Sequence, residues 1–126
     1  MQELKTRGIR GANIVRENTR ESIFEATREV LEKIFELNLI EREEIAAVYF
    51  TLTSDLNASF PAEVAHEMGL TSVPLLCVQE IAVPGSLPQV VRILMLINTK
   101  LRQSEIRHVF LGEAQKLRED LSQEEI

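Results

Sequence analysis

The chain has 126 residues, a formal net charge of −6 and a single cysteine, Cys77. This length predicts one domain over residues 1–126, with a flexible tail from about 119. The acidic charge argues against a nucleic-acid partner, and a single thiol excludes an intrachain disulfide. No stretch approaches the roughly 20 apolar residues of a membrane span and the N-terminus has no signal-type apolar core, so we expect a cytoplasmic protein with no membrane partner.

In chain order, residues 6–15 are expected to form a first strand. Asn18 and Glu21 resemble a capping box, which predicts a helix from near Thr19 to about Leu37. Apolar residues recur at helical spacing within it: Ile23, Thr27, Val30, Leu31 and Ile34. The remaining expected elements are strands at 45–53, 73–82, 90–99 and 107–111, a short helix at 62–68 ended by Gly69, and short helical turns near 103–104 and 113–117.

One long helix followed mainly by strands indicates an α+β fold with a mixed or antiparallel sheet. A sheet covered by a single helix leaves its other face exposed. An exposed apolar sheet face is typical of a protein interface, so this arrangement predicts an oligomer.

Two charged residues stand out because their surroundings are apolar. Arg92 is the one cation in the apolar run of residues 90–97, and alternation places it on the same face as Leu94 and Leu96, which offer no partner. Between Glu67 and Glu105, Glu80 is the only acidic residue. An unpaired buried cation costs several kcal/mol, so Arg92 requires an anion. That anion is either Glu80, in a structural ion pair, or a ligand oxygen, in an anion-binding site.

Other candidate residues carry less information. Arg10 lies between Ile9 and Gly11, where glycine permits close approach of a ligand or another strand. Cys77 is more typical of a small buried apolar residue than of a nucleophile. His66 and His108 lack metal-ligand spacing, and neither a catalytic triad nor a glycine-rich phosphate loop is present. These observations leave chemistry without a cofactor, or simple anion binding.

Several short blocks are similar to the monofunctional, trimeric chorismate mutases of the AroH class. In chain order they are Arg7-Gly8-Ile9-Arg10-Gly11-Ala12, Asp55-Leu56, Phe60-Pro61-Ala62, Val73-Pro74, Cys77-Val78-Gln79-Glu80, Arg92, Arg107-His108-Val109-Phe110-Leu111, Leu117-Arg118 and Asp120-Leu121. They cover about residues 6 to 121 in the order of that family. The resemblance implies a five-stranded mixed sheet packed on one long helix, three subunits in a pseudo-α/β barrel, and active sites between neighbours.

The resemblance also implies the activity and the residues that perform it. Chorismate would rearrange to prephenate without a cofactor or metal, with Arg92 facing the ether oxygen and Arg10 holding a carboxylate. Glu80 and Cys77 would meet the ring hydroxyl. Residues three apart in a strand point to opposite faces, so either the strand bends between Cys77 and Glu80 or Cys77 acts through its backbone N–H, and we favour the backbone.

The family pattern further implies a set of residues that line the substrate cleft. These are Phe60, Leu75 and Leu76 from the neighbouring subunit, Leu117 and Arg118 near the tail, and Phe110 and His66, whereas Arg7 is left as structural. Three residues depart from the pattern, namely Phe110 in place of a tyrosine, and Glu63 and His66 where basic residues often occur. We therefore expect weaker capture of a dianion. Two alternatives are a trimeric imine deaminase of the Rid type and a non-catalytic trimer that binds an aromatic-pathway metabolite.

Overall fold

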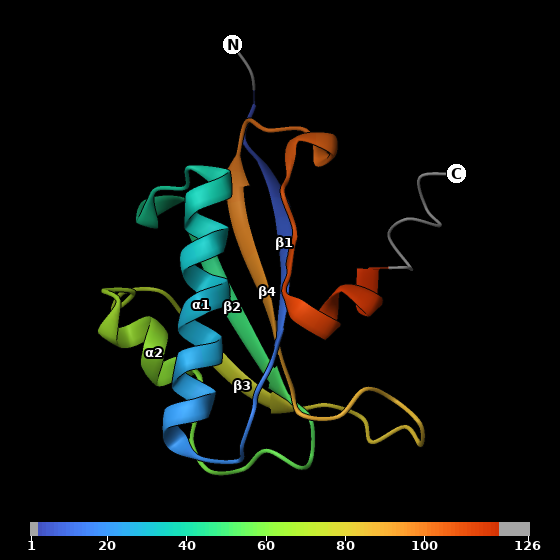
Figure 1. The fold of residues 1–126 in the computed structure, drawn as a ribbon. Coiled ribbons are helices and arrows are strands. Elements are labelled where there is room, and N and C mark those ends of the chain that lie inside the picture. Colours follow the sequence, from blue (N-terminus) through green and yellow to red (C-terminus); the bar gives the residue numbers. More distant parts are fainter. Residues whose placement is uncertain (1–2, 119–126) are drawn as a thin grey trace.

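The computed structural model describes residues 3–118 (Figure 1). The strands are β1 (Lys5–Ile14), β2 (Ile45–Leu52), β3 (Leu75–Gln79), β4 (Val90–Thr99) and β5 (Val109–Phe110), and the helices are α1 (Arg20–Asn38) and α2 (Ala62–Glu67). Short 3-10 turns lie at Arg42–Glu44, Gln103–Glu105 and Gly112–Arg118. The tail predicted from about residue 119 lies outside the described residues, and the single-domain organisation of the whole chain stays a prediction.

All five strands belong to one sheet in the order β3-β2-β4-β1-β5. β4 pairs antiparallel with both β1 and β2, whereas the edge strands pair in parallel, β3 with β2 and β5 with β1. α1 lies across one face of this sheet (Figure 1). The predicted α+β class, with a mixed sheet and one long helix, is confirmed.

α1 packs on the sheet through the predicted apolar stripe, whose five members are all buried. Each fully buried Ile, Val or Leu of this kind contributes about 1.5–3 kcal/mol. Gly11 of β1 makes the approach close, because a Cβ there would lie 2.9 Å from Val30 Cγ2 and 3.0 Å from Ile34 Cδ1. The glycine beside Arg10 therefore serves helix packing, and not the approach of a ligand.

The start of α1 corrects the capping box expected at Asn18. The N-cap is Thr19, in extended backbone, and its Oγ1 accepts a hydrogen bond from Ser22 N at 3.1 Å. Asn18 Oδ1 instead accepts from Asn57 N at 2.9 Å and from Ala58 N at 3.0 Å. Asn18 thus binds the loop after β2 through hydrogen bonds. This contact joins segments about 40 residues apart, so the sequence around Asn18 does not predict it.

β3 is shorter than the predicted strand at 73–82 because its partner ends first. Glu80 N still donates to Leu52 O, the last residue of β2, at 2.9 Å. The next residue, Thr53, donates its N–H to Val90 O at 3.1 Å and so turns toward β4. Beyond Glu80 the chain has no strand to pair with, and the regular strand ends.

β5 is also shorter than the predicted 107–111, and the cause is a side chain at the end of α1. Asn38 Oδ1 accepts from Arg107 N, and Asn38 Nδ2 donates to Arg107 O, both at 2.9 Å. The main chain of Arg107 is thereby tied to the helix and does not pair with β1. The buried side-chain amide of Asn38 thus satisfies the N–H and the carbonyl of Arg107, in place of strand hydrogen bonds to β1.

The face of the sheet opposite α1, called the open face below, carries no α-helix among the described residues, and only the 3-10 turn Gly112–Arg118 packs on it, through Ala114 and Leu117. Along β4 the buried residues Ile93, Met95 and Ile97 alternate with residues that are more exposed. Four large apolar side chains on this face are substantially exposed: Tyr49 (37%), Leu76 (52%), Val78 (42%) and Leu94 (40%). An apolar surface of this kind is typical of a contact with another protein chain.

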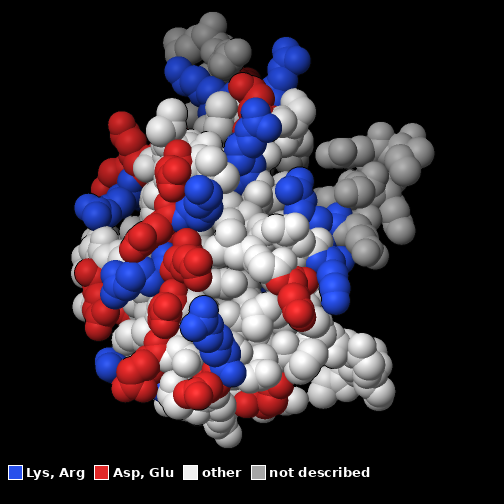
Figure 2. All heavy atoms as spheres, viewed as in Figure 1, with Lys and Arg blue, Asp and Glu red and all other residues white. Residues whose placement is uncertain are grey.

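Charged side chains cover the α1 side of the molecule, where acids and bases are intermixed (Figure 2). The loop 81–89 between β3 and β4 carries no charged residue and forms the white projection at the lower right of Figure 2. Its Ile81 and Val83 are 87% and 56% exposed. No helix within residues 3–118 is long and apolar enough to cross a membrane.

Candidate active site

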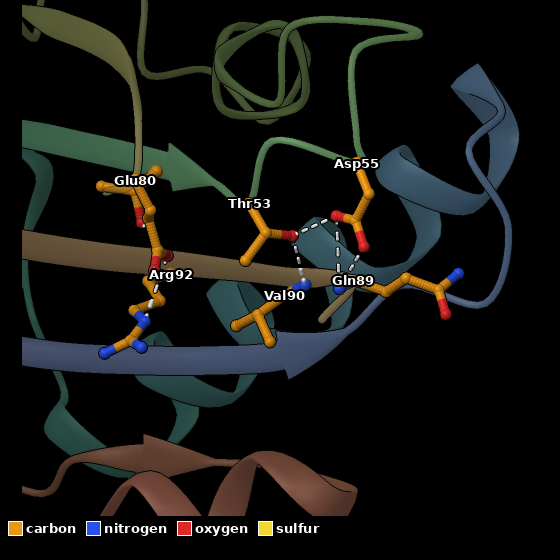
Figure 3. Close-up of polar contacts among 7 residues, drawn as sticks. Thr53, Asp55, Glu80, Gln89, Val90 and Arg92 are labelled. Carbon is orange, nitrogen blue, oxygen red and sulfur yellow. Dashed lines mark hydrogen bonds and ion pairs between the residues drawn. The ribbon is translucent and has the colours of Figure 1, made fainter. Parts of the chain in front are cut away.

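Arg92 lies on the open face, paired across the sheet with Thr51 of β2 and Ala12 of β1. Its buried Nε lies 3.1 Å from Glu80 Oε2, but the N–H is not directed at that oxygen, so the contact is an ion pair without an aligned hydrogen bond. The two terminal nitrogens point away from Glu80 (Figure 3) and form no hydrogen bond within residues 3–118. The ion pair with Glu80 therefore exists, and donors remain for a second anion.

Glu80 is fixed on the same face although it lies beyond the end of β3. Thr51 Oγ1 donates to its Oε2 at 2.6 Å, and that oxygen also faces Arg92. The Glu80 side chain is only 16% exposed. Its other oxygen, Oε1, accepts no hydrogen bond from any described residue. A carboxylate held in this way can accept one further hydrogen bond from a ligand.

Two further cations, Arg10 and Arg118, lie beside Arg92 and next to β5. Phe110 follows Arg92 and Ala12 in the same row across the sheet. Arg10 Cζ lies 5.2 Å and Arg118 Cζ 5.9 Å from the centroid of the Phe110 ring, and the ring face attracts both guanidinium groups. Leu117 packs against the same buried cluster as Phe110. This corner of the open face therefore brings two guanidinium groups together in a chain whose net charge is −6.

Thr51 and His108 hold Glu80 and Arg10 in place, and neither contact could be predicted from the sequence. His108 Nδ1 accepts a hydrogen bond from Arg10 N at 2.9 Å. Burial, and then the charges of Arg10 and Arg118, lower the pKa of His108 below its ordinary value, so the imidazole is neutral at neutral pH. His108 lies 98 positions from Arg10 in the chain, and Thr51 lies 29 positions from Glu80, so only the fold brings each pair together.

Two of the remaining predicted residues, Phe60 and Cys77, line a cavity of about 560 Å³ at the edge of the sheet formed by β3. Phe60, Glu63, Cys77 and residues of the loop after β2 line it. Phe60 is 67% exposed, a large value for an aromatic side chain. Neither Arg10 nor Arg92 belongs to the lining of this cavity. The predicted site residues thus fall into two groups within one subunit.

The Cys77 thiol points away from Arg92, as the alternation of strand residues predicts. Cys77 pairs with the buried Phe50 and packs against the main core, together with Leu75. Burial, opposed by a backbone hydrogen bond from Ala62, raises the pKa of the thiol, and the charge of Glu63 raises it further. The thiol therefore stays protonated at neutral pH and is a poor nucleophile.

The backbone N–H of Cys77 has a different direction from its thiol. Val48 N donates to Pro74 O at 3.0 Å and Glu80 N donates to Leu52 O at 2.9 Å, so the even-numbered residues of β3 turn their main-chain groups toward β2. In a parallel pair the intervening residues turn theirs outward. The Cys77 N–H consequently points to the free edge of the sheet.

Leu76, His66 and Arg7 do not line the cavity and do not contact Arg92 or Glu80. Leu76 is exposed on the open face, His66 is exposed on α2, and Arg7 donates from its Nε to Leu101 O at 3.0 Å. No set of three or more His, Cys, Asp or Glu side chains in the described part of the chain is arranged to hold a metal ion. What the open face offers is a fixed cation, a fixed carboxylate and two more guanidinium groups, an arrangement suited to an anionic substrate.

Comparison with known proteins identifies the class to which this arrangement belongs. The family model described as chorismate mutase type I matches residues 6–121. A chorismate mutase AroH of Thermus thermophilus is 55% identical over 116 residues, covering 91% of this chain and 95% of that protein. The AroH chorismate mutase of Bacillus subtilis is 42% identical, covering 92% of each. A solved chorismate mutase from Clostridium thermocellum superposes with a TM-score of 0.85 at 42% identity, covering 87% of this chain and 98% of the other.

The chain therefore belongs to the type I chorismate mutase family, a class of isomerases. Its activity is that of a chorismate mutase of aromatic amino acid biosynthesis. The similarity to the AroH class predicted from short sequence blocks is confirmed, and the alternatives of an imine deaminase and a non-catalytic trimer are not supported.

Proposed function

We propose that three copies of this chain assemble and convert chorismate to prephenate in clefts where the Arg92 group of one subunit meets the Phe60 group of the next. The observation that carries the proposal is the guanidinium of Arg92, which is ion-paired with Glu80 but incompletely hydrogen-bonded, on the sheet face that no α-helix covers. We place the enzyme in the cytoplasm, where the single free thiol of Cys77 stays reduced.

The reaction is a [3,3] rearrangement within one molecule, in which a carbon–oxygen bond breaks while a carbon–carbon bond forms. Negative charge gathers on the ether oxygen in the transition state, and a fixed cation facing it stabilises that state more than the ground state. Arg92 supplies this cation. Closure of the cleft between subunits removes water from the part of this side chain that is exposed in a single subunit, which strengthens the interaction.

Glu80 accepts a hydrogen bond from the ring hydroxyl through its free Oε1. Its charge also faces the ring, where partial positive charge develops as the bond breaks. The Cys77 N–H, at the free edge of β3, donates to the same hydroxyl. Neither contact requires the Cys77 thiol, which packs toward the core.

Arg10 holds a substrate carboxylate, and Arg118 with Leu117 closes over it from the segment after β5. The two guanidinium groups lie against the Phe110 ring, which orients them without neutralising them. Holding the substrate in its compact reactive conformer contributes the entropic part of the acceleration. No cofactor is needed for any of these steps.

Assembly joins the two groups of residues that are separate within a subunit. The exposed apolar side chains of the open face form the contact between subunits, with Leu76 among them. Phe60 of one subunit then forms an apolar wall of its neighbour's site, with Leu75 behind it and His66 nearby on α2. Head-to-tail contacts of this kind can close into a ring, and the resemblance to the trimeric AroH class puts the number of copies at three.

Mixed trimers test both the activity and the shared site. We expect Arg92→Ala and Phe60→Asp each to lose nearly all conversion of chorismate to prephenate, because one removes the cation and the other places a carboxylate beside a dianion. The two variants are co-expressed with different affinity tags, and trimers that carry both tags are isolated. In a ring of three, such trimers contain one site built from two unaltered halves, so activity should return to about one third of wild type.

Homogeneous trimers of each variant, prepared in the same way, are the controls. Mixed trimers that remain as inactive as their parents would mean that each site is built within one subunit. Full activity of Phe60→Asp alone would remove Phe60 from the site.

Phe110→Tyr is expected to lower KM by up to about tenfold, because a tyrosine hydroxyl can donate to a substrate carboxylate beside Arg10. The value of kcat should change little, since the hydroxyl meets the substrate equally in ground and transition states. Phe24→Tyr is a matched control, because Phe24 also stacks with an arginine, Arg20, at 4.2 Å, but lies on α1. An unchanged KM in Phe110→Tyr would show that this position does not touch the substrate.

A further inference from the structure

The strand that carries Arg92 begins at an unusual junction. Gln89, immediately before β4, has a left-handed backbone (φ 55°), which residues other than glycine seldom adopt. Its N–H donates to the Asp55 carboxylate, at 3.0 Å to Oδ2 and 3.3 Å to Oδ1 (Figure 3). Asp55 belongs to the turn after β2, so this contact joins the end of one strand to the start of another.

The first bond of the ladder between β2 and β4 passes through a side chain. Thr53 N donates to Val90 O at 3.1 Å, as in a regular antiparallel pair. The return bond from Val90 N goes to Thr53 Oγ1, at 3.0 Å, because the Thr53 carbonyl is occupied by Leu56 N. The Thr53 hydroxyl in turn donates to Asp55 Oδ1 at 2.5 Å. This chain of hydrogen bonds ends on a charge, and each bond polarises the next.

The same junction is also held from the side of β1. Val15 N donates to Gln89 O at 2.7 Å, and Gln89 Nε2 donates to Arg16 O at 3.0 Å. The backbone of Gln89 is thus fixed by three bonded groups, its N–H, its carbonyl and its side chain. Arg92 follows three residues later, so the direction in which β4 leaves this junction sets where the guanidinium lies.

We propose that Asp55 is a positioning residue for the reaction: through Thr53 and Gln89 it fixes the start of β4 and hence the place of the Arg92 guanidinium against the substrate. This inference rests on the catalytic role proposed above for Arg92. Asp55 does not line the cavity of Phe60 and Cys77, so its effect is indirect. A misplacement of about 1 Å can cost about 10²-fold in rate, and a partly released strand should lose a fraction of that.

The first measurement separates kcat from KM in single variants. Asp55→Ala should lower kcat by about tenfold with KM nearly unchanged, because the change affects the placement of a transition-state contact. Thr53→Val, which keeps the shape of the side chain but removes the hydroxyl, should give a similar loss. Asp55→Asn and Thr53→Ser retain the acceptor or hydroxyl and should recover most of kcat.

Thr99→Val is the matched control, because Thr99 Oγ1 accepts a hydrogen bond from Leu101 N at 3.3 Å at the far end of the same strand. It removes the same kind of bond from β4, so its effect on unfolding should resemble that of Thr53→Val while kcat stays at the wild-type value. A loss of kcat in Thr99→Val equal to that in Thr53→Val would show that any weakening of β4 has this effect, and would overturn the proposal.

A double-variant cycle then asks whether Asp55 acts through Arg92. Arg92→Lys keeps the charge on a flexible stem whose ammonium is less dependent on exact backbone placement. We expect Asp55→Ala to cost about tenfold in the wild-type background but less than about threefold in Arg92→Lys. A full tenfold loss in both backgrounds would mean that Asp55 acts elsewhere, and no loss in either would mean that it has no role.

The cycle also distinguishes this inference from the proposed function. If Arg92→Lys alone retains wild-type kcat, the role of Arg92 is wrong and the inference fails with it. If Arg92→Lys lowers kcat but the loss from Asp55→Ala is additive, only the inference fails.

Discussion

Arg92→Ala should lower kcat/KM by at least about 10²–10³-fold, equivalent to about 3–4 kcal/mol of transition-state stabilisation. The substitution removes the cation that we propose faces the ether oxygen, and it also leaves the mostly buried Glu80 carboxylate without its partner at 3.1 Å. An unpaired charge beside a dianionic substrate adds repulsion, so the loss can exceed that of one neutral donor. Steady-state conversion of chorismate to prephenate, with an unfolding curve to show that the variant is folded, measures the effect.

Arg28→Ala is the control for removing an arginine from this protein. Arg28 pairs with Glu67 at 3.2 Å, but both side chains are more than two-fifths exposed, and exposed ion pairs contribute only about 0–1 kcal/mol. Its activity should stay within about twofold of wild type. Undiminished activity in Arg92→Ala would overturn the mechanism.

Tyr49→Asp should separate the subunits and remove nearly all activity. Tyr49 lies on the open face, paired with Leu94 on one side and Leu76 on the other. In an assembled trimer a carboxylate there would be desolvated among apolar side chains at a cost of several kcal/mol, whereas in a monomer it is solvated. Size-exclusion chromatography with light scattering measures the assembly, and circular dichroism checks that the monomer is folded.

Leu39→Asp provides the comparison for Tyr49→Asp. Leu39 is 88% exposed at the end of α1, on the other side of the sheet, and its left-handed backbone (φ 48°) tolerates aspartate well. This variant should remain trimeric and active. A Tyr49→Asp protein that is still trimeric and active would show that the open face is not the contact between subunits.

The central part of the fold could be predicted from the sequence because its signals are local. The apolar stripe of α1 and the apolar run of β4, which only Arg92 interrupts before Asn98, depend on the residues of one element, and both were placed correctly. The edge strands β3 and β5 were predicted too long, because their ends are set by where the chain turns toward β4 at Thr53 and by the hydrogen bonds of Asn38 to Arg107. A strand ends where its partner ends, and a single sequence does not contain that information.

The candidate site divides in the same way. Arg92 stands out as a lone cation in an apolar strand, and the opposite directions of Cys77 and Glu80 follow from alternation. Thr51 and His108 could not be found, because a threonine in a strand and a histidine just before one carry no signal until the fold places them beside Glu80 and Arg10. The roles assigned to individual side chains stay predictions, based on resemblance and on the geometry that accompanies it.

The outward direction of the Cys77 N–H bears on how this position can vary. A donor that belongs to the main chain is supplied equally by cysteine, alanine, threonine or valine, so natural variants could exchange the residue here without losing the interaction. Only proline, which has no N–H, would delete it. Tolerance of many residue types at 77 would therefore be no sign that the position is idle, and scanning with alanine would overlook it.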